Sequence, residues 1–113
     1  MNKREAKGLG IDTGYEIAAT HVEEARAGRL PRDCEQLAAE AAETESDHYR
    51  QFSPFEFTAA EFNRARDPDA MWEAYDSGVW RGIWKRLREA GCRGGSKGRK
   101  TIKDFGGARR GRR

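Results

Sequence analysis

Five side chains of this sequence are of the types that hold metals or carry out acid–base chemistry. They are two cysteines, two histidines and one aspartate: Cys34, Cys92, His21, His48 and Asp76. Fourteen residues separate Cys34 from His48. That separation is about 21 Å along a helix at roughly 1.5 Å per residue, so these two cannot bind one zinc ion. We therefore expect no metal and no cofactor.

Asp76 is the candidate for a catalytic carboxylate. It falls among Trp72, Val79 and Ile83 on the apolar stripe of a predicted helix. A buried carboxylate is costly unless it is paired or hydrogen-bonded. General acid or base catalysis needs a second positioned group, and the sequence indicates none. We expect Asp76 to accept hydrogen bonds from a helix N-terminus or from an internal base such as His21.

Two further patterns resemble catalytic motifs but have the wrong geometry. Ser46, Asp47 and His48 are consecutive, so their side chains point in different directions and cannot form a triad by themselves. The segment GGSKGRKT has glycine and lysine at the wrong spacing for a phosphate-binding loop, and no predicted strand precedes it. The protein is therefore predicted not to be an enzyme.

The cysteines and the apolar residues indicate a compartment. Cys34 and Cys92 form no CxxC pair and no disulfide framework, which predicts free thiols in a reducing environment. No apolar run approaches the roughly 20 residues of a membrane span. The N-terminal stretch MNKREAKGLGID lacks the apolar segment of a secretory signal. We expect a cytoplasmic protein.

Charge is divided unequally along the 113 residues. Residues 1–92 hold 13 lysines and arginines against 18 aspartates and glutamates, whereas residues 93–113 hold 9 against the single acid Asp104. The second segment also contains six glycines and no apolar periodicity. We predict a helical domain at 1–92 and a flexible basic tail at 93–113 that is disordered when free.

The basic tail is the clearest binding signal in the sequence. A flexible polycation can follow a phosphate backbone, gaining affinity from counterion release with little sequence specificity. Phe105 could stack on a base. Two other interpretations stay open: a solubilising terminus, or a tail that folds back onto the acidic second helix. The predicted nucleic-acid-binding residues are Arg93, Lys97, Arg99, Lys100, Lys103, Arg109, Arg110, Arg112 and Arg113.

The elements that must position these residues are helices. A capping box and two capping aspartates precede helices that we predict over 3–27, 34–50 and 68–90. Gly28 and Gly91 can end the first and the last of them. The caps are Asn2 with Glu5, Asp33, and Asp67 with Pro68.

A phenylalanine-rich segment connects the second helix to the last. Its cap-like signals predict short helical turns, and its aromatic side chains are expected to close one end of the core. The phenylalanines are Phe52, Phe55, Phe57 and Phe62. The predicted fold is an all-α bundle of three main helices with this short helical connection.

The first and last predicted helices each contain two glycines four residues apart. A glycine in a helix interior costs about 1 kcal/mol relative to alanine, so a compensating interaction is expected. This spacing allows two helix backbones to approach closely. We predict that the helices cross at Gly10, Gly14, Gly78 and Gly82. Alternatively, one glycine pair accepts a helix or loop of a partner protein.

An aromatic and cationic edge of the last helix predicts a protein-binding surface. Trp80 is expected in the core, whereas Trp84 sits at the margin of the apolar stripe and fits the core or an interface equally. The second helix carries a strongly acidic face. The predicted protein-binding residues are Trp84, Arg81, Arg88, Glu40 and Glu43.

Three segments, KREAKGLGIDTGYEIA, SPFEFTAAEFN and WEAYDSGVWRGI, together resemble a pattern of small uncharacterised proteins encoded by bacteriophages and prophages. The resemblance covers most of residues 3–83 and excludes the tail. It implies a setting in which small non-enzymatic proteins bind and inhibit host machinery, anti-CRISPR proteins among them. We therefore expect an accessory protein that binds a host protein or nucleoprotein complex. The alternative is a nucleic-acid-binding protein that acts through its tail.

Overall fold

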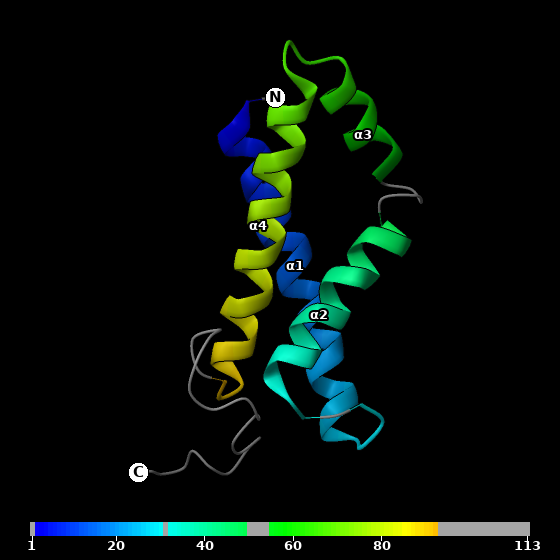
Figure 1. The fold of residues 1–113 in the computed structure, drawn as a ribbon, viewed down its shortest axis with the longest axis vertical. Coiled ribbons are helices and arrows are strands. Elements are labelled where there is room, and N and C mark those ends of the chain that lie inside the picture. The colour runs from blue at the N-terminus through cyan, green and yellow to red at the C-terminus, as the bar shows by residue number, and fades with distance from the viewer. Residues whose placement is uncertain (1, 31, 50–54, 93–113) are drawn as a thin grey trace.

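The computed structural model describes residues 2–30, 32–49 and 55–92, and the elements in these ranges are all helices (Figure 1). They are α1 (Lys3–Arg26), α2 (Cys34–Thr44), the π-helical segment η1 (Glu45–Tyr49), α3 (Phe55–Asn63) and α4 (Pro68–Glu89). The predicted all-α fold is confirmed. The predicted tail at 93–113 lies outside the described residues.

Helix starts follow the predicted capping signals. The Asn2 side chain accepts a hydrogen bond from the Glu5 backbone, and the Glu5 side chain accepts one from the Asn2 backbone. The Asp33 side chain accepts two backbone N–H bonds at the start of α2, and the Asp67 side chain accepts the N–H of Ala70 at the start of α4. Each cap satisfies donors that the first helical turn leaves unpaired.

Both long helices end at a glycine in the same type of turn. Gly28 and Gly91 have φ values of 83° and 106°, in the left-handed region that glycine adopts without strain. After α4, the N–H of Cys92 donates to the Leu87 carbonyl at 2.9 Å, and α1 ends with the equivalent bond. These are Schellman motifs. The turn at Gly91 directs Cys92 back against the helices.

The second predicted helix remains α-helical only as far as Thr44 and then widens into η1. The Thr44 hydroxyl donates to the Glu40 carbonyl, a local bond that competes with the backbone ladder. The last turn of α2 has no basic residue, and Glu45 and Asp47 follow it. Negative charge at the negative end of a helix dipole is unfavourable. These features explain why regular α-helix stops there.

The contact between α1 and α4 dominates the fold. The two helices run in parallel and cross closely (Figure 1). A Cβ atom added to any of four glycines would come closer than 3.0 Å to a backbone carbonyl oxygen of the facing helix. The pairs are Gly10 with Tyr75, Gly14 with Val79, Gly78 with Lys7 and Gly82 with Ile11. This is the crossing that the glycine spacing predicts.

The four contacts are reciprocal, because each helix places two glycines against carbonyl groups of the other. Glycine carries a hydrogen atom where other residues carry Cβ. This Cα–H group can form a Cα–H···O contact with the facing carbonyl oxygen. Such contacts contribute about 0.5–1 kcal/mol each. Together with close packing of the backbones, they offset the cost of glycine in a helix.

The core lies where α1, α2 and α4 meet. Small side chains on α1 and α2 allow a close approach, and the larger fully buried side chains on α4 are Tyr75, Ile83 and Leu87. Phe62 of α3 is buried and makes edge-to-face contacts with Trp72 and Tyr75 at centroid distances of 4.9 and 5.8 Å. Phe62 therefore closes the end of the core as predicted. Phe52, with the side chains of Phe55 and Phe57, lies outside the described part.

The two cysteines form a disulfide, so the prediction of free thiols is wrong. Cys34 is the first residue of α2, Cys92 follows the glycine that ends α4, and their Cα atoms lie 6.0 Å apart. Both are buried, at 0% and 6% exposure. The two cysteines lie 58 positions apart in the sequence, so their spacing does not indicate a disulfide. They meet because the start of α2 and the end of α4 lie together in the fold. Structural disulfides are typical of oxidising compartments, so the cysteines do not support a reducing one.

Alanine substitutions test the glycine crossing. We expect Gly14→Ala and Gly78→Ala to lower the free energy of unfolding by about 2 kcal/mol or more, because the new methyl group would force the backbones apart. Gly8→Ala is the matched control in α1, since its Cβ meets nothing within 4 Å. It should raise stability by up to about 1 kcal/mol. Urea unfolding followed by circular dichroism measures all three, and equal effects at the three positions would contradict the crossing.

The disulfide can be tested by mass and by stability. The unreduced protein should be lighter than the reduced protein by two hydrogen atoms. Closing a loop across 58 positions stabilises the fold by about 4 kcal/mol in the chain-entropy description. Cys34→Ser, Cys92→Ser and the double variant should therefore lose the same amount, since each removes one shared bond. A double variant that unfolds at the wild-type urea concentration would contradict a structural role.

Candidate functional site

The structure contradicts the position expected for Trp80 of α4, and it places Trp84, for which core and interface both stayed open, in the core. Trp84 is 4% exposed, and Trp80, predicted in the core, is 47% exposed. α2 lies against α4 near the disulfide and leans away from it further along (Figure 1). Burial on this side of α4 therefore depends on position along the helix axis. A helical wheel shows only the angle around that axis, which is why it misplaced Trp80.

Asp76 is also exposed, and it lies one turn before Trp80 on α4. The prediction of a buried carboxylate was wrong. His21 does not serve as its base, because the His21 ring bonds Ile17 and Thr44. The exposed position removes the reason for treating Asp76 as a catalytic group.

Trp80 and Trp84 form a supported aromatic pair. Their ring centroids are 6.1 Å apart and the ring planes meet at 75°, an edge-to-face arrangement. Such pairs contribute about 0.5–1.5 kcal/mol beyond burial. The indole N–H of Trp84 is buried and has no hydrogen-bond partner among the described residues. The buried ring of Trp84 thus holds the exposed ring of Trp80 in place.

Two of the predicted cations lie on the same helix as this pair. Arg81 follows Trp80 directly, Arg88 lies about two turns further on, and both are exposed. We define the Trp80 surface as Trp80, Arg81 and Arg88, with Trp84 beneath. It is an exposed aromatic ring beside positive charge on a helix whose backbone is fixed against α1.

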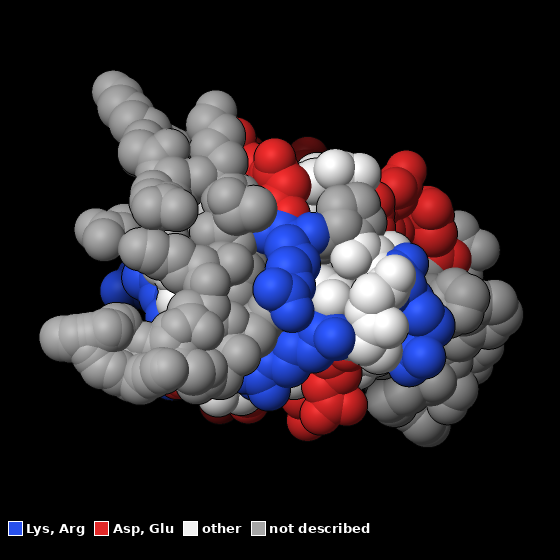
Figure 2. Space-filling view, turned by 90° about the horizontal axis from the view of Figure 1, so that it is seen from below, with Lys and Arg blue, Asp and Glu red and all other residues white. Residues whose placement is uncertain are grey.

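Basic side chains also gather at the end of the molecule where α1 and α4 terminate and α2 begins. Seen from this end, lysines and arginines form a central band, and acidic side chains lie beyond its upper and lower ends (Figure 2). The last turns of α1 and α4 contribute Arg26, Arg86 and Arg88. The nine predicted nucleic-acid-binding residues of 93–113 lie outside the described residues, but Cys92, from which that segment continues, is part of this end.

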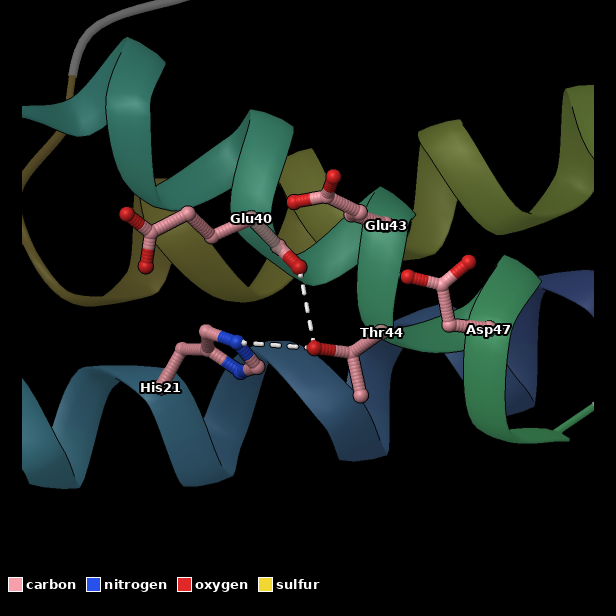
Figure 3. A pocket seen from close by; sticks show the side chains of 5 residues that line it. All are labelled: His21, Glu40, Glu43, Thr44 and Asp47. Carbon is pink, nitrogen blue, oxygen red and sulfur yellow. Dashed lines mark hydrogen bonds between the residues drawn. The ribbon is translucent and has the colours of Figure 1, made fainter.

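A shallow depression between α1 and α2 gathers the acidic residues predicted for protein binding. It is lined by His21, Glu40, Glu43, Thr44 and Asp47 (Figure 3). The His21 Nδ1 donates to the Ile17 carbonyl at 2.9 Å, since a carbonyl can only accept, and Nε2 lies 3.3 Å from the Thr44 hydroxyl. Both ring nitrogens are therefore engaged within the protein.

The chemistry of this depression is limited. A general base needs a nitrogen or carboxylate oriented toward a substrate, and the internal bonds of His21 give the ring a structural role. Within the described ranges, no group of three or more His, Cys, Asp or Glu residues is arranged to hold a metal ion. The depression includes no residue of α4, so Glu40 and Glu43 do not form one site with the Trp80 surface.

A hydrogen bond that sequence reasoning missed joins the other side of α1 to the end of α4. The Tyr15 hydroxyl donates to the Glu89 carboxylate at 2.5 Å, and the Lys85 ammonium lies 5.6 Å from the centre of the Tyr15 ring. The bond to Glu89, followed by partial burial and the negative charge of Glu89, raises the pKa of Tyr15 above its ordinary value of 10.0.

Comparisons with protein-family models, with curated proteins and with solved structures found no match. Among the helices that the structure describes, none combines the length and apolar character that crossing a membrane requires. The fold and the surfaces define an all-helical domain built on a parallel, glycine-packed helix pair, with an exposed tryptophan on α4 and a cationic band at one end.

The Tyr15 bond predicts a pH dependence of stability. The folded-state pKa of Tyr15 is raised, so its contribution is present below the unfolded-state pKa near 10.0 and is lost as pH rises through the folded-state value. Tyr15→Phe should therefore be less stable than wild type at neutral pH, and the difference should shrink in strong alkali. Urea unfolding at several pH values measures it. A difference that stays constant across this range would exclude the bond as its cause.

Proposed function

We propose that this protein is a non-enzymatic binding protein that docks a protein partner through the Trp80 surface. The observation that carries the proposal is the exposure of Trp80, at 47% the one large hydrophobic side chain identified as exposed within the described ranges. Tryptophan and arginine are the residue types most enriched among those that dominate binding energy at interfaces. An exposed tryptophan beside two arginines has this composition.

The support beneath Trp80 favours binding over accidental exposure. Trp84 packs edge-to-face against it, and α4 itself is fixed by the glycine contacts with α1 and by the disulfide to α2. A side chain that is already held in place loses less conformational entropy on binding, which improves affinity. The surface therefore resembles a preorganised anchor.

The charges suggest the chemistry of the partner. Arg81 and Arg88 accompany Trp80 on α4, so the complementary surface is an apolar pocket with carboxylates at its rim. The resemblance to small phage and prophage proteins favours a host protein or nucleoprotein complex, with inhibition as the outcome of binding. The proposed setting is the cytoplasm of a bacterial host, where burial of Cys34 and Cys92 would shield the disulfide from thiol reductants.

The experiment compares wild type with Trp80→Ala and Trp80→Phe. Affinity capture from host lysate identifies a partner, and calorimetry with the purified partner measures binding. We expect Trp80→Ala to lose at least about 2 kcal/mol of binding free energy, or about 30-fold in affinity, and Trp80→Phe to retain part of it. The free energy of unfolding should change little, because Trp80 is half exposed.

Arg64→Ala is the control, because it removes an exposed arginine from the turn between α3 and α4. It should leave binding unchanged. A partner that binds Trp80→Ala as tightly as wild type would refute the Trp80 surface as the docking site.

A further inference from the structure

The exposed charges of α4 are separated by sign along the helix. All three exposed charged residues before Trp80 are acids, and three of the four after it are bases. The acids are Asp69, Glu73 and Asp76, and the bases are Arg81, Lys85 and Arg88. The exception is Glu89, whose carboxylate accepts the Tyr15 hydroxyl. Trp80 stands between the two groups, within two residues of the middle of α4.

The helix dipole accounts for only part of this order. Charges interact favourably with the dipole in the first and last turns of a helix, which here contain Asp69 and Arg88. Glu73, Asp76 and Arg81 lie further inside α4, where the dipole contributes little. The separation of charge therefore extends beyond what the helix ends require.

Within one chain, this order of charges is unfavourable. Residues three or four apart are neighbours on a helix surface, and like charges at that spacing destabilise the helix. The like-charged neighbours are Asp69 with Glu73, Glu73 with Asp76, Arg81 with Lys85, and Lys85 with Arg88. No ion pair joins Glu73 or Arg88 to another of the described residues. A surface that carries the opposite charges in the matching order would relieve this repulsion.

A second copy of α4 in antiparallel orientation has that order. Glu73 lies seven residues before Trp80 and Arg88 eight residues after it, or about 10.5 and 12 Å along the axis at roughly 1.5 Å per residue. Both lie within about 80° of Trp80 around the axis at roughly 100° per residue, so the three share one side of α4. When two copies face each other at Trp80, Arg88 of each copy lies opposite Glu73 of the other. A two-fold axis forms both pairs at once.

The centre of this arrangement is apolar. Trp80 is 47% exposed, and its ring packs edge-to-face against the buried ring of Trp84. α2 leans away from this part of α4, and the exposure of Glu73 and Trp80 shows that their side of the helix is open (Figure 1). Two Trp80 rings near a two-fold axis would cover each other from water and gain the burial that each lacks in one chain.

We infer that the exposed side of α4 is a self-association surface, on which two copies of this chain form an antiparallel dimer centred on Trp80. The dimer needs no host partner. Its consequence for binding, however, rests on the proposed function. Two Trp80 rings that cover each other cannot contact a partner protein, so the single chain is the form that docks. Self-association thereby keeps the Trp80 surface covered at high protein concentration.

Sedimentation equilibrium of the full chain measures the dimer. One exposed tryptophan per copy makes a small interface, so the protein concentration should extend from about 1 μM to about 1 mM. Wild type should pass from the mass of one chain to twice that mass within this range. Trp80→Ala should weaken self-association at least about tenfold, because it removes both central rings. A wild-type protein that keeps the mass of one chain throughout overturns the inference.

Charge reversal tests the antiparallel order. Glu73→Arg and Arg88→Glu should each weaken self-association about tenfold, because each places like charges opposite one another twice in the dimer. A mixture of the two variants should regain the dimer, since every pair in the mixed dimer is again of opposite sign. The double variant Glu73→Arg/Arg88→Glu should self-associate as wild type does. Single variants that stay monomeric when mixed would contradict this order.

Glu23→Arg is the matched control. It reverses an exposed acid of α1, the helix that packs on the glycine side of α4, away from Trp80. It should self-associate as wild type does, and weakening equal to that of Glu73→Arg would make net charge the cause and overturn the inference. Circular dichroism should show the same helix content in every variant.

Partner binding separates this inference from the proposed function. Glu73→Arg keeps Trp80, Arg81 and Arg88, so it should bind the host partner at least as tightly as wild type. A protein that binds the partner through Trp80 but remains a single chain at about 1 mM refutes the dimer alone. A dimer that the charge variants disrupt as expected, with partner binding unaffected by Trp80→Ala, refutes the docking proposal alone.

Discussion

The fold depends on the close parallel crossing of α1 and α4. Two glycines on each helix face carbonyl oxygens of the other, and a Cβ at any of the four positions would meet backbone atoms. Backbone atoms cannot rotate away as a side chain can, so the crossing permits only glycine at these positions. The close crossing explains why both long helices retain glycines that weaken each helix by itself. It also fixes the backbone of α4, which carries Trp80.

The disulfide adds the third helix to this pair. The positive φ of Gly91 turns the chain after α4, and the turn brings Cys92 to the first residue of α2. α2 is thereby fastened to α4 at one end while it leans away at the other (Figure 1). This bond brings the chain segments that carry Cys34 and Cys92 to the same end of the molecule.

Local signals were sufficient to predict most of the helical framework. The capping residues before α1, α2 and α4 and the two terminating glycines act within a few residues of the chain, so their effects are visible in sequence. The spacing of four glycines also indicated the crossing, because helix periodicity places each pair on one face. The candidate site was predicted less well: the helix and its cations were found, but the exposed ring proved to be Trp80, and Trp84 lies beneath it.

By itself the sequence determined the all-helical class, the helix ends, the glycine faces and the division between an acidic domain and a basic segment. These follow from local hydrogen bonding, helix periodicity and composition. Only the tertiary structure decided the pairing of Cys34 with Cys92, the exposure of Asp76 and Trp80, and the cationic end. Each of these depends on how far one helix lies from another at a given height along its axis, and no pattern within a single helix records that distance.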